Sequence, residues 1–268
     1  MLIFDMHTHC FPDALAPKAL PHLAQISQSP YYSDGTYGDL REKEFAAGCA
    51  GLMILHIATK PTQMTSVNNF AAACQKDGVY CFGSVFPTAE NAVEELHRIR
   101  ALGLKGVKLH PDYQEFFVND ARVFPVYEAA AALGLPVAFH AGRDPYSPDV
   151  VHCTPSMLAE VADRFPALTI IGAHMGGMEM DEDVERYVIG KPNIYLDTAF
   201  ATRSLSPARC GELIRRHGAD KVFFATDFPW STVEAERDLL EKAGLTEEEL
   251  ALIYHGNVER VFGITLSE

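Results

Sequence analysis

The feature that most constrains the fold of this chain is a regular alternation of short apolar runs with longer amphipathic stretches. Each apolar run has the length and composition of a strand, and several are apolar at nearly every position, as in strands buried on both faces. Eight such runs occur, at residues 2–6, 51–57, 79–85, 106–110, 136–140, 168–174, 193–197 and 221–227. The alternation predicts a parallel sheet whose strands are joined by crossover helices.

The stretches between the runs carry apolar residues at intervals of three and four, which is typical of helices with one buried face. We expect such helices at residues 89–102, 121–133, 155–165, 207–217 and 232–243. Thr154 and Ser206 each precede a proline and are expected to be N-caps, while Thr246 with Glu249 has the pattern of a capping box. Because one barrel absorbs about 250 residues, the chain is expected to be a single α/β domain over residues 1–268, a (β/α)8 TIM barrel.

One irregular segment, residues 11–38, follows the first apolar run and is rich in Pro, Ser, Tyr and Gly. It is expected to be a long loop after the first strand. Loops at the carboxyl ends of barrel strands surround the active site, so this segment is a candidate lid.

The acidic balance restricts the partners of the chain. Its formal net charge is −14 and its pI is about 5.2, so it lacks the basic face that nucleic acid or an anionic membrane requires. The six cysteines form no C-x-x-C pair, and no apolar stretch is long enough to span a bilayer. We expect a cytoplasmic protein with a small-molecule substrate, and a homodimer is left open.

Histidines at the ends of the predicted strands are the main candidates for a functional site. His7 and His9 are two residues apart, so an extended backbone points both imidazoles to the same side. Other predicted strands end in ionisable or metal-binding side chains, namely Lys108 with His110, His140, His174 and Asp227. A barrel gathers these strand ends on one rim, which predicts a metal site there.

Three imidazoles and one carboxylate suit Zn²⁺, and also Mn²⁺, Fe²⁺ or Co²⁺, with one coordination position left for water. Such an ion can activate water as a nucleophile or polarise a substrate oxygen. The predicted site therefore fits both hydrolysis and the loss of a carboxyl group.

Five ordered motifs resemble the amidohydrolase superfamily across the whole chain: His-Thr-His at 7–9, GVKLHP at 106–111, FHAG at 139–142, GAHMGG at 172–177 and ATDFPW at 225–230. In detail the sequence is most similar to the amidohydrolase-2 branch, which includes nonoxidative decarboxylases related to aminocarboxymuconate-semialdehyde decarboxylase. The segment YHGNVERVFG at 254–263 resembles the C-terminal helix of that branch.

The resemblance implies that His7, His9, His140 and Asp227 are the metal ligands. His174 would then lie beside the metal as a proton shuttle or substrate-polarising group, and Asp227 could also take a proton from the metal-bound water. Which of His140 and His174 binds the metal directly stays open.

Lys108 has two interpretations, because a carboxylated lysine bridges the two metals of some superfamily members. The alternative, an amine paired with a carboxylate or an anionic substrate, favours a single metal, and we expect one ion. His110, Arg143 and Arg203 are candidate substrate contacts, with a structural or solvated role as the alternative for each. His152 and the other histidines in loops and helices are left out of the predicted site.

Three functions are compatible with these residues. The first expectation is a metal-dependent hydrolase that cleaves an ester, lactone or amide in a small substrate bearing a carboxylate. The alternative is a nonoxidative metal-dependent decarboxylase that uses the same residues. The third is a non-catalytic zinc-binding barrel, which is disfavoured because structural zinc sites close four protein ligands around the ion.

Overall fold

The computed structural model describes residues 1–266. The chain divides into two compact units, the first made of Met1–Ile54, Asp77–Val79 and Leu196–Glu268 and the second of Leu55–Lys76 and Tyr80–Tyr195. Each of the eight predicted runs contains all or part of a strand. The strands are β1 Phe4–Thr8, β2 Gly51–Leu55, β3 Val79–Phe82, β4 Val107–Leu109, β5 Val137–Phe139, β6 Ile170–Gly172, β7 Ile194–Asp197 and β8 Val222–Phe223. The single domain over residues 1–268 stays a prediction, and its last two positions lie outside the described residues.

The first unit is built around β1, whose five residues are all buried. β1 pairs in parallel with β2, and on its other side the Met6 N–H donates to the Phe224 carbonyl at 2.9 Å. β8 in turn pairs in parallel with β7. The helices of this unit are α1 Ala16–Ser27, α2 Tyr37–Ala46, α8 Pro207–His217, α9 Val233–Glu241, α10 Glu247–Ala251 and α11 Asn257–Phe262.

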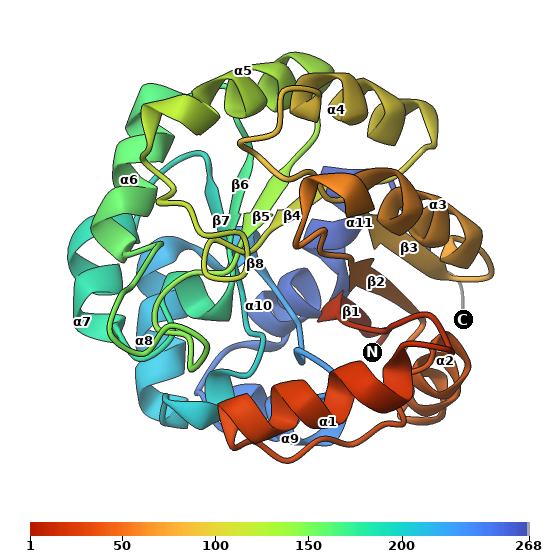
Figure 1. Ribbon diagram of the computed structural model, residues 1–268. Coiled ribbons are helices and arrows are strands. Elements are labelled where there is room, and N and C mark those ends of the chain that lie inside the picture. The colour runs from red at the N-terminus through yellow and green to blue at the C-terminus, as the bar shows by residue number, and fades with distance from the viewer. Residues whose placement is uncertain (267–268) are drawn as a thin grey trace. The chain divides into compact units, whose positions relative to one another are not determined.

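The second unit is built on β4, β5 and β6, which pair in parallel and are buried along their length. Its helices are α3 Met64–Cys74, α4 Ala92–Ala101, α5 Phe124–Leu133, α6 Pro155–Arg164 and the short α7 Asp181–Asp183. Figure 1 shows α4, α5 and α6 on the outer side of these three strands. Strands covered by crossover helices explain why the runs are apolar at almost every position.

Helix ends follow the predicted capping chemistry. The Thr154 side chain accepts from the Met157 N–H at α6, and the Ser206 side chain accepts from the Arg209 N–H at α8. At α10 both halves of the capping box between Thr246 and Glu249, the third residue of the helix, are present. Within residues 1–266, no helix is both long and apolar enough to cross a membrane.

The expectation of an irregular segment over residues 11–38 is wrong. This segment contains α1, a twelve-residue helix, and the first two residues of α2. Pro17 lies in the first turn of α1, where a backbone N–H has no helical partner, so it does not oppose the helix. Ala16 and Leu20 form its buried face, and this packing overrides the prolines that suggested a loop.

Candidate metal centre

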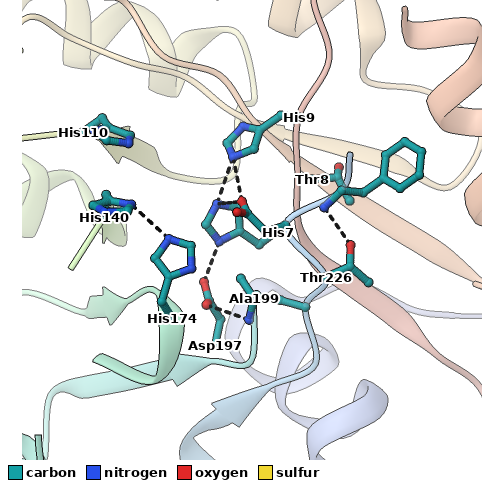
Figure 2. Close-up of polar contacts among 12 residues, drawn as sticks. His7, Thr8, His9, His110, His140, His174, Asp197, Ala199 and Thr226 are labelled. Carbon is teal, nitrogen blue, oxygen red and sulfur yellow. Dashed lines mark hydrogen bonds and ion pairs between the residues drawn. The ribbon is translucent and has the colours of Figure 1, made fainter. Parts of the chain in front are cut away.

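Strand β1 brings two imidazoles to a common point. His7 lies within the strand and is fully buried, and His9 follows it and is half-buried. Their Nε2 atoms are 3.1 Å apart, and the rings meet edge to face at an interplanar angle of 75°. Figure 2 shows both nitrogens directed at this point. The prediction from the two-residue spacing therefore agrees with the geometry.

Asp227 joins the two histidines from the segment after β8. Its Oδ1 is 3.2 Å from His9 Nε2 and 3.4 Å from His7 Nε2. The backbone of Asp227 has a φ of 65°, in the left-handed region that non-glycine residues seldom adopt. Its N–H donates to the His7 carbonyl at 2.8 Å, and its own carbonyl accepts from the Trp230 N–H at 2.9 Å. These bonds hold a sparsely populated conformation that aims the carboxylate at the histidines.

The donor atoms of His7, His9 and Asp227 fit a divalent metal. Two ligands at about 2.0–2.2 Å from a tetrahedral ion are separated by about 3.3 Å, close to the three separations observed. Because the two rings lie at a steep angle, their in-plane lone pairs can converge on one ion. This group therefore satisfies both the distance and the direction that a metal requires.

Asp5 holds the backbone of this group by hydrogen bonds to His7 and Thr226. Its fully buried carboxylate accepts from the His7 N–H at 3.0 Å, the Thr226 N–H at 3.2 Å and the Thr226 hydroxyl at 2.5 Å. Burial raises the pKa of Asp5 to about 7. Asp5 thus ties β1 to the residue that precedes Asp227, so both ligand-bearing segments are anchored to one side chain.

The second unit contains another group of two histidines and an aspartate. Asp144 Oδ2 lies 3.6 Å from His110 Nε2 and 3.4 Å from His140 Nε2. Within residues 1–266, this group and the one just described are the two whose ligand atoms all lie within 4.8 Å of one another. The rings of His110 and His140, however, are stacked at 4.3 Å with an interplanar angle of 13°. Their lone pairs run nearly parallel, so these two rings do not turn toward a common point as those of His7 and His9 do.

His174 lies next to the second group without belonging to it. Its Nε2 is 3.0 Å from His140 Nδ1, and the two rings meet edge to face at 61° (Figure 2). Like Asp227, it has a left-handed backbone, with a φ of 56°, and it is buried. The structure thus brings together the two histidines between which the sequence left the ligand role open.

A buried polar network beside His110 was missed by the sequence analysis. Asp112 accepts from His152 Nδ1 at 2.9 Å and from the Ser147 hydroxyl, and Tyr113 stacks on His110 at 3.6 Å. His152 had been left out as an ordinary loop residue. The partners come from separate loops, and no local pattern in the sequence links them.

The other predicted substrate contacts are placed as follows. Lys108 lies in β4 and is buried, and it is part of neither histidine–aspartate group. Arg143 is exposed in the loop after β5, and Arg203 is exposed with its Nη1 donating to the Ser29 hydroxyl at 3.1 Å. Their contacts with a substrate, and that of His110, stay predictions.

Known proteins resemble the chain along most of its length. Gamma-resorcylate decarboxylase of Polaromonas sp. is 24% identical over 271 residues, covering 83% of this chain and 77% of the relative. A solved structure of an uncharacterised TIM-barrel protein from Bordetella bronchiseptica superposes with a TM-score of 0.77 at 19% identity, covering 98% of this chain and 99% of the other. Dihydroxybenzoic acid decarboxylase of Polaromonas sp., solved with manganese and 2-nitroresorcinol, gives a TM-score of 0.73 at 18% identity, covering 98% and 97%.

These relatives correct the first functional expectation. From the sequence alone a hydrolase of esters, lactones or amides was expected, but the curated relative and the manganese-bound structural neighbour are both named as decarboxylases. The error has a chemical cause, because the same histidines and aspartate can serve either reaction. The alternative drawn from the sequence agrees better with the comparisons.

The family itself is shown by a match along nearly the whole chain. The model of the family described as Amidohydrolase matches residues 4–264. The structural likeness, at under 25% identity, supports the fold, in which parallel strands alternate with helices as the apolar runs predicted. This chain is therefore an enzyme of the amidohydrolase family, and its fold is a (β/α)8 TIM barrel.

Proposed function

We propose that this protein is a metal-dependent nonoxidative decarboxylase, a carboxy-lyase that acts on a small carboxylic acid. The observation that carries the proposal is the convergence of His7, His9 and Asp227 on one point, in a chain whose curated relative is a decarboxylase. Hydroxylated benzoic acids are the first substrates to test, because the relatives are named for them.

In this proposal His7, His9 and Asp227 hold one divalent ion, with His140 as the fourth ligand that the resemblance implies. When bound, the ion would supply positive charge to hold the oxygens of an anionic substrate. Two imidazoles and a carboxylate suit Zn²⁺ and Mn²⁺ alike, and one structural relative holds manganese. A second ion at a carboxylated Lys108 is the alternative arrangement.

The reaction replaces a carbon–carboxylate bond by a carbon–hydrogen bond. A proton is added to the carbon that bears the carboxylate, the bond to the carboxyl carbon then breaks, and its electrons stay on the substrate as CO₂ leaves. His174 is assigned the delivery of that proton, since an imidazole can carry one near neutral pH. Asp227, also expected from the sequence to take a proton from metal-bound water, has only the ligand role in this reaction, because decarboxylation of a carboxylate consumes a proton and releases none.

A direct test is CO₂ release by protein that has been stripped of metal and reloaded with Mn²⁺ or Zn²⁺. A panel of dihydroxybenzoates and 5-carboxyvanillate should give CO₂ in a one-to-one ratio to the acid consumed, and only after reloading. Phenyl acetate and a simple lactone serve as controls for hydrolysis. Ester or lactone cleavage with no CO₂ from any acid, or decarboxylation that persists after metal removal, would contradict the proposal.

A further inference from the structure

Asp197 lies against the candidate metal centre without belonging to its donor group. It is the last residue of β7, and both its side chain and that of His7 are completely buried. Its Oδ2 is 2.9 Å from His7 Nδ1, whereas His9 lies at the other ring nitrogen, Nε2 (Figure 2). Asp227 also contacts Nε2. From the sequence alone, Asp197 is the last residue of a predicted strand, and no role is expected for it.

The position of this carboxylate is fixed by its own strand. Asp197 pairs with Phe223 of β8, and the next residue donates its N–H to the Phe223 carbonyl at 3.0 Å. The second carboxylate oxygen, Oδ1, accepts from the Ala199 N–H at 3.2 Å, which forms a turn closed by the side chain. One oxygen is therefore held by the local backbone, and the other is presented to His7.

This contact determines which nitrogen of His7 carries the proton. An ionised carboxylate can only accept a hydrogen bond, so Nδ1 of His7 must be the donor. In the neutral imidazole the lone pair is then on Nε2, the atom that faces His9 and Asp227. A carboxylate on the far nitrogen also makes the ring a stronger base toward a metal.

We infer that Asp197 is a positioning residue, which fixes the tautomer and orientation of His7 so that Nε2 is available to the metal. The inference rests on the proposed function only in taking His7 as a ligand. A purely structural buried pair would stabilise the fold without affecting metal affinity, and the two roles therefore predict different measurements.

The first test measures the affinity of the protein for Zn²⁺ by competition with a chelator. Asp197→Asn removes the charge but keeps the shape, and we expect it to weaken metal binding by about 10- to 100-fold. Glu95→Gln is the control, because Glu95 is a buried carboxylate of the second unit that binds the Asn68 amide and contacts no candidate ligand. This control should leave the metal affinity unchanged. Equal affinity of Asp197→Asn and the wild type would overturn the inference.

The second test is read on the wild-type protein, and variants serve only to assign its signals and to compare with them. The ¹⁵N resonances of His7 in the metal-free wild-type protein, assigned by comparison with His7→Gln, should show Nδ1–H and an unprotonated Nε2. A ring protonated on Nε2 alone would contradict the inference even if metal binds. Asp197→Leu, which fills a similar volume without an acceptor, should abolish the preference for that tautomer.

These results are separable from those that test the proposed function. If Asp197 controls metal affinity but no acid is decarboxylated, the inference holds and the proposed reaction fails. If CO₂ is released and Asp197→Asn binds metal as tightly as the wild type, the proposed reaction holds and the inference fails.

Discussion

The two histidine–aspartate groups of the molecule contain the same residue types but differ in the direction of their rings. His7 and His9 meet edge to face at 75°, whereas His110 and His140 are stacked at 13°. The distances from each aspartate to its histidines are similar, between 3.2 and 3.6 Å. Distance and composition alone would therefore describe both as metal sites, and ring direction separates them.

The difference follows from how strands place their side chains. Residues two apart on one strand lie on the same side and can tilt toward a common point, as His7 and His9 do. His110 and His140 instead each follow one member of the paired residues Leu109 and Phe139 on neighbouring strands. Parallel strands lie about 4.8 Å apart, so side chains in register are held face to face at close to stacking distance. The two histidines of one strand can therefore converge, whereas His110 and His140, in register on neighbouring strands, stack.

Removing one histidine from each group tests which of the two groups binds the metal. His9→Gln should lose the metal and bring decarboxylation down by roughly 10³-fold or more, because several kcal/mol of charge stabilisation are lost with the ion. His110→Gln should keep the metal content of the wild type. Metal analysis of the dialysed proteins checks this, and a loss of metal in His110→Gln alone would reverse the assignment of the two groups.

A smaller effect is expected at His174, which is assigned proton delivery. His174→Asn should retain the metal but lower kcat for decarboxylation by roughly 10²-fold, the lower end of the usual contribution of a general acid. Steady-state kinetics with metal analysis on the same sample distinguishes this outcome from ligand loss. Unchanged kcat would remove His174 from the mechanism.

The sequence predicts the secondary structure of this protein better than it predicts the contacts between distant side chains. All eight strands were recognisable because runs buried on both faces are apolar throughout, and the strand-end histidines followed from them. Helix α1 was missed because its prolines suggested a loop, although Pro17 occupies a first-turn position that tolerates it. The roles of Asp197 and Asp112 could not be predicted, since each depends on a contact between segments far apart in the chain.

A substitution at Gly142 tests how the loop that carries Asp144 is held. A Cβ at this position, where φ is 91°, would lie 2.1 Å from the backbone nitrogen of Met178. Gly142→Ala should therefore lower the free energy of unfolding by about 3–5 kcal/mol, from steric overlap and backbone strain together. Gly134→Ala is the control, because its φ is 63° but nothing lies within 4 Å of the added Cβ. Gly134→Ala should lower the free energy of unfolding, measured with urea, by about 1 kcal/mol. If both variants lost the same free energy, the backbone near Gly142 would have moved to accommodate the added Cβ.

The smallest expected effect concerns Glu236, in the unit that contains His7. Burial raises its pKa from the ordinary value of 4.5 to about 7, so between these pH values the folded protein keeps a proton that the unfolded chain has already released. Its contribution to stability is complete below pH 4.5 and is lost as the pH rises to about 7, on the order of 1–3 kcal/mol. Glu236→Gln should flatten this part of the stability profile measured by urea unfolding from pH 4.5 to 8. The exposed Glu128→Gln should leave the slope unchanged, and an unaltered slope in Glu236→Gln would refute the assignment.

The most direct measurement of the central claim is the anomalous scattering of crystals of the manganese-loaded protein. We predict a peak about 2.0–2.2 Å from His7 Nε2, His9 Nε2 and Asp227 Oδ1, and none between His110, His140 and Asp144. A peak among those last three residues, or no peak at His7 and His9 in protein that releases CO₂, would contradict the account.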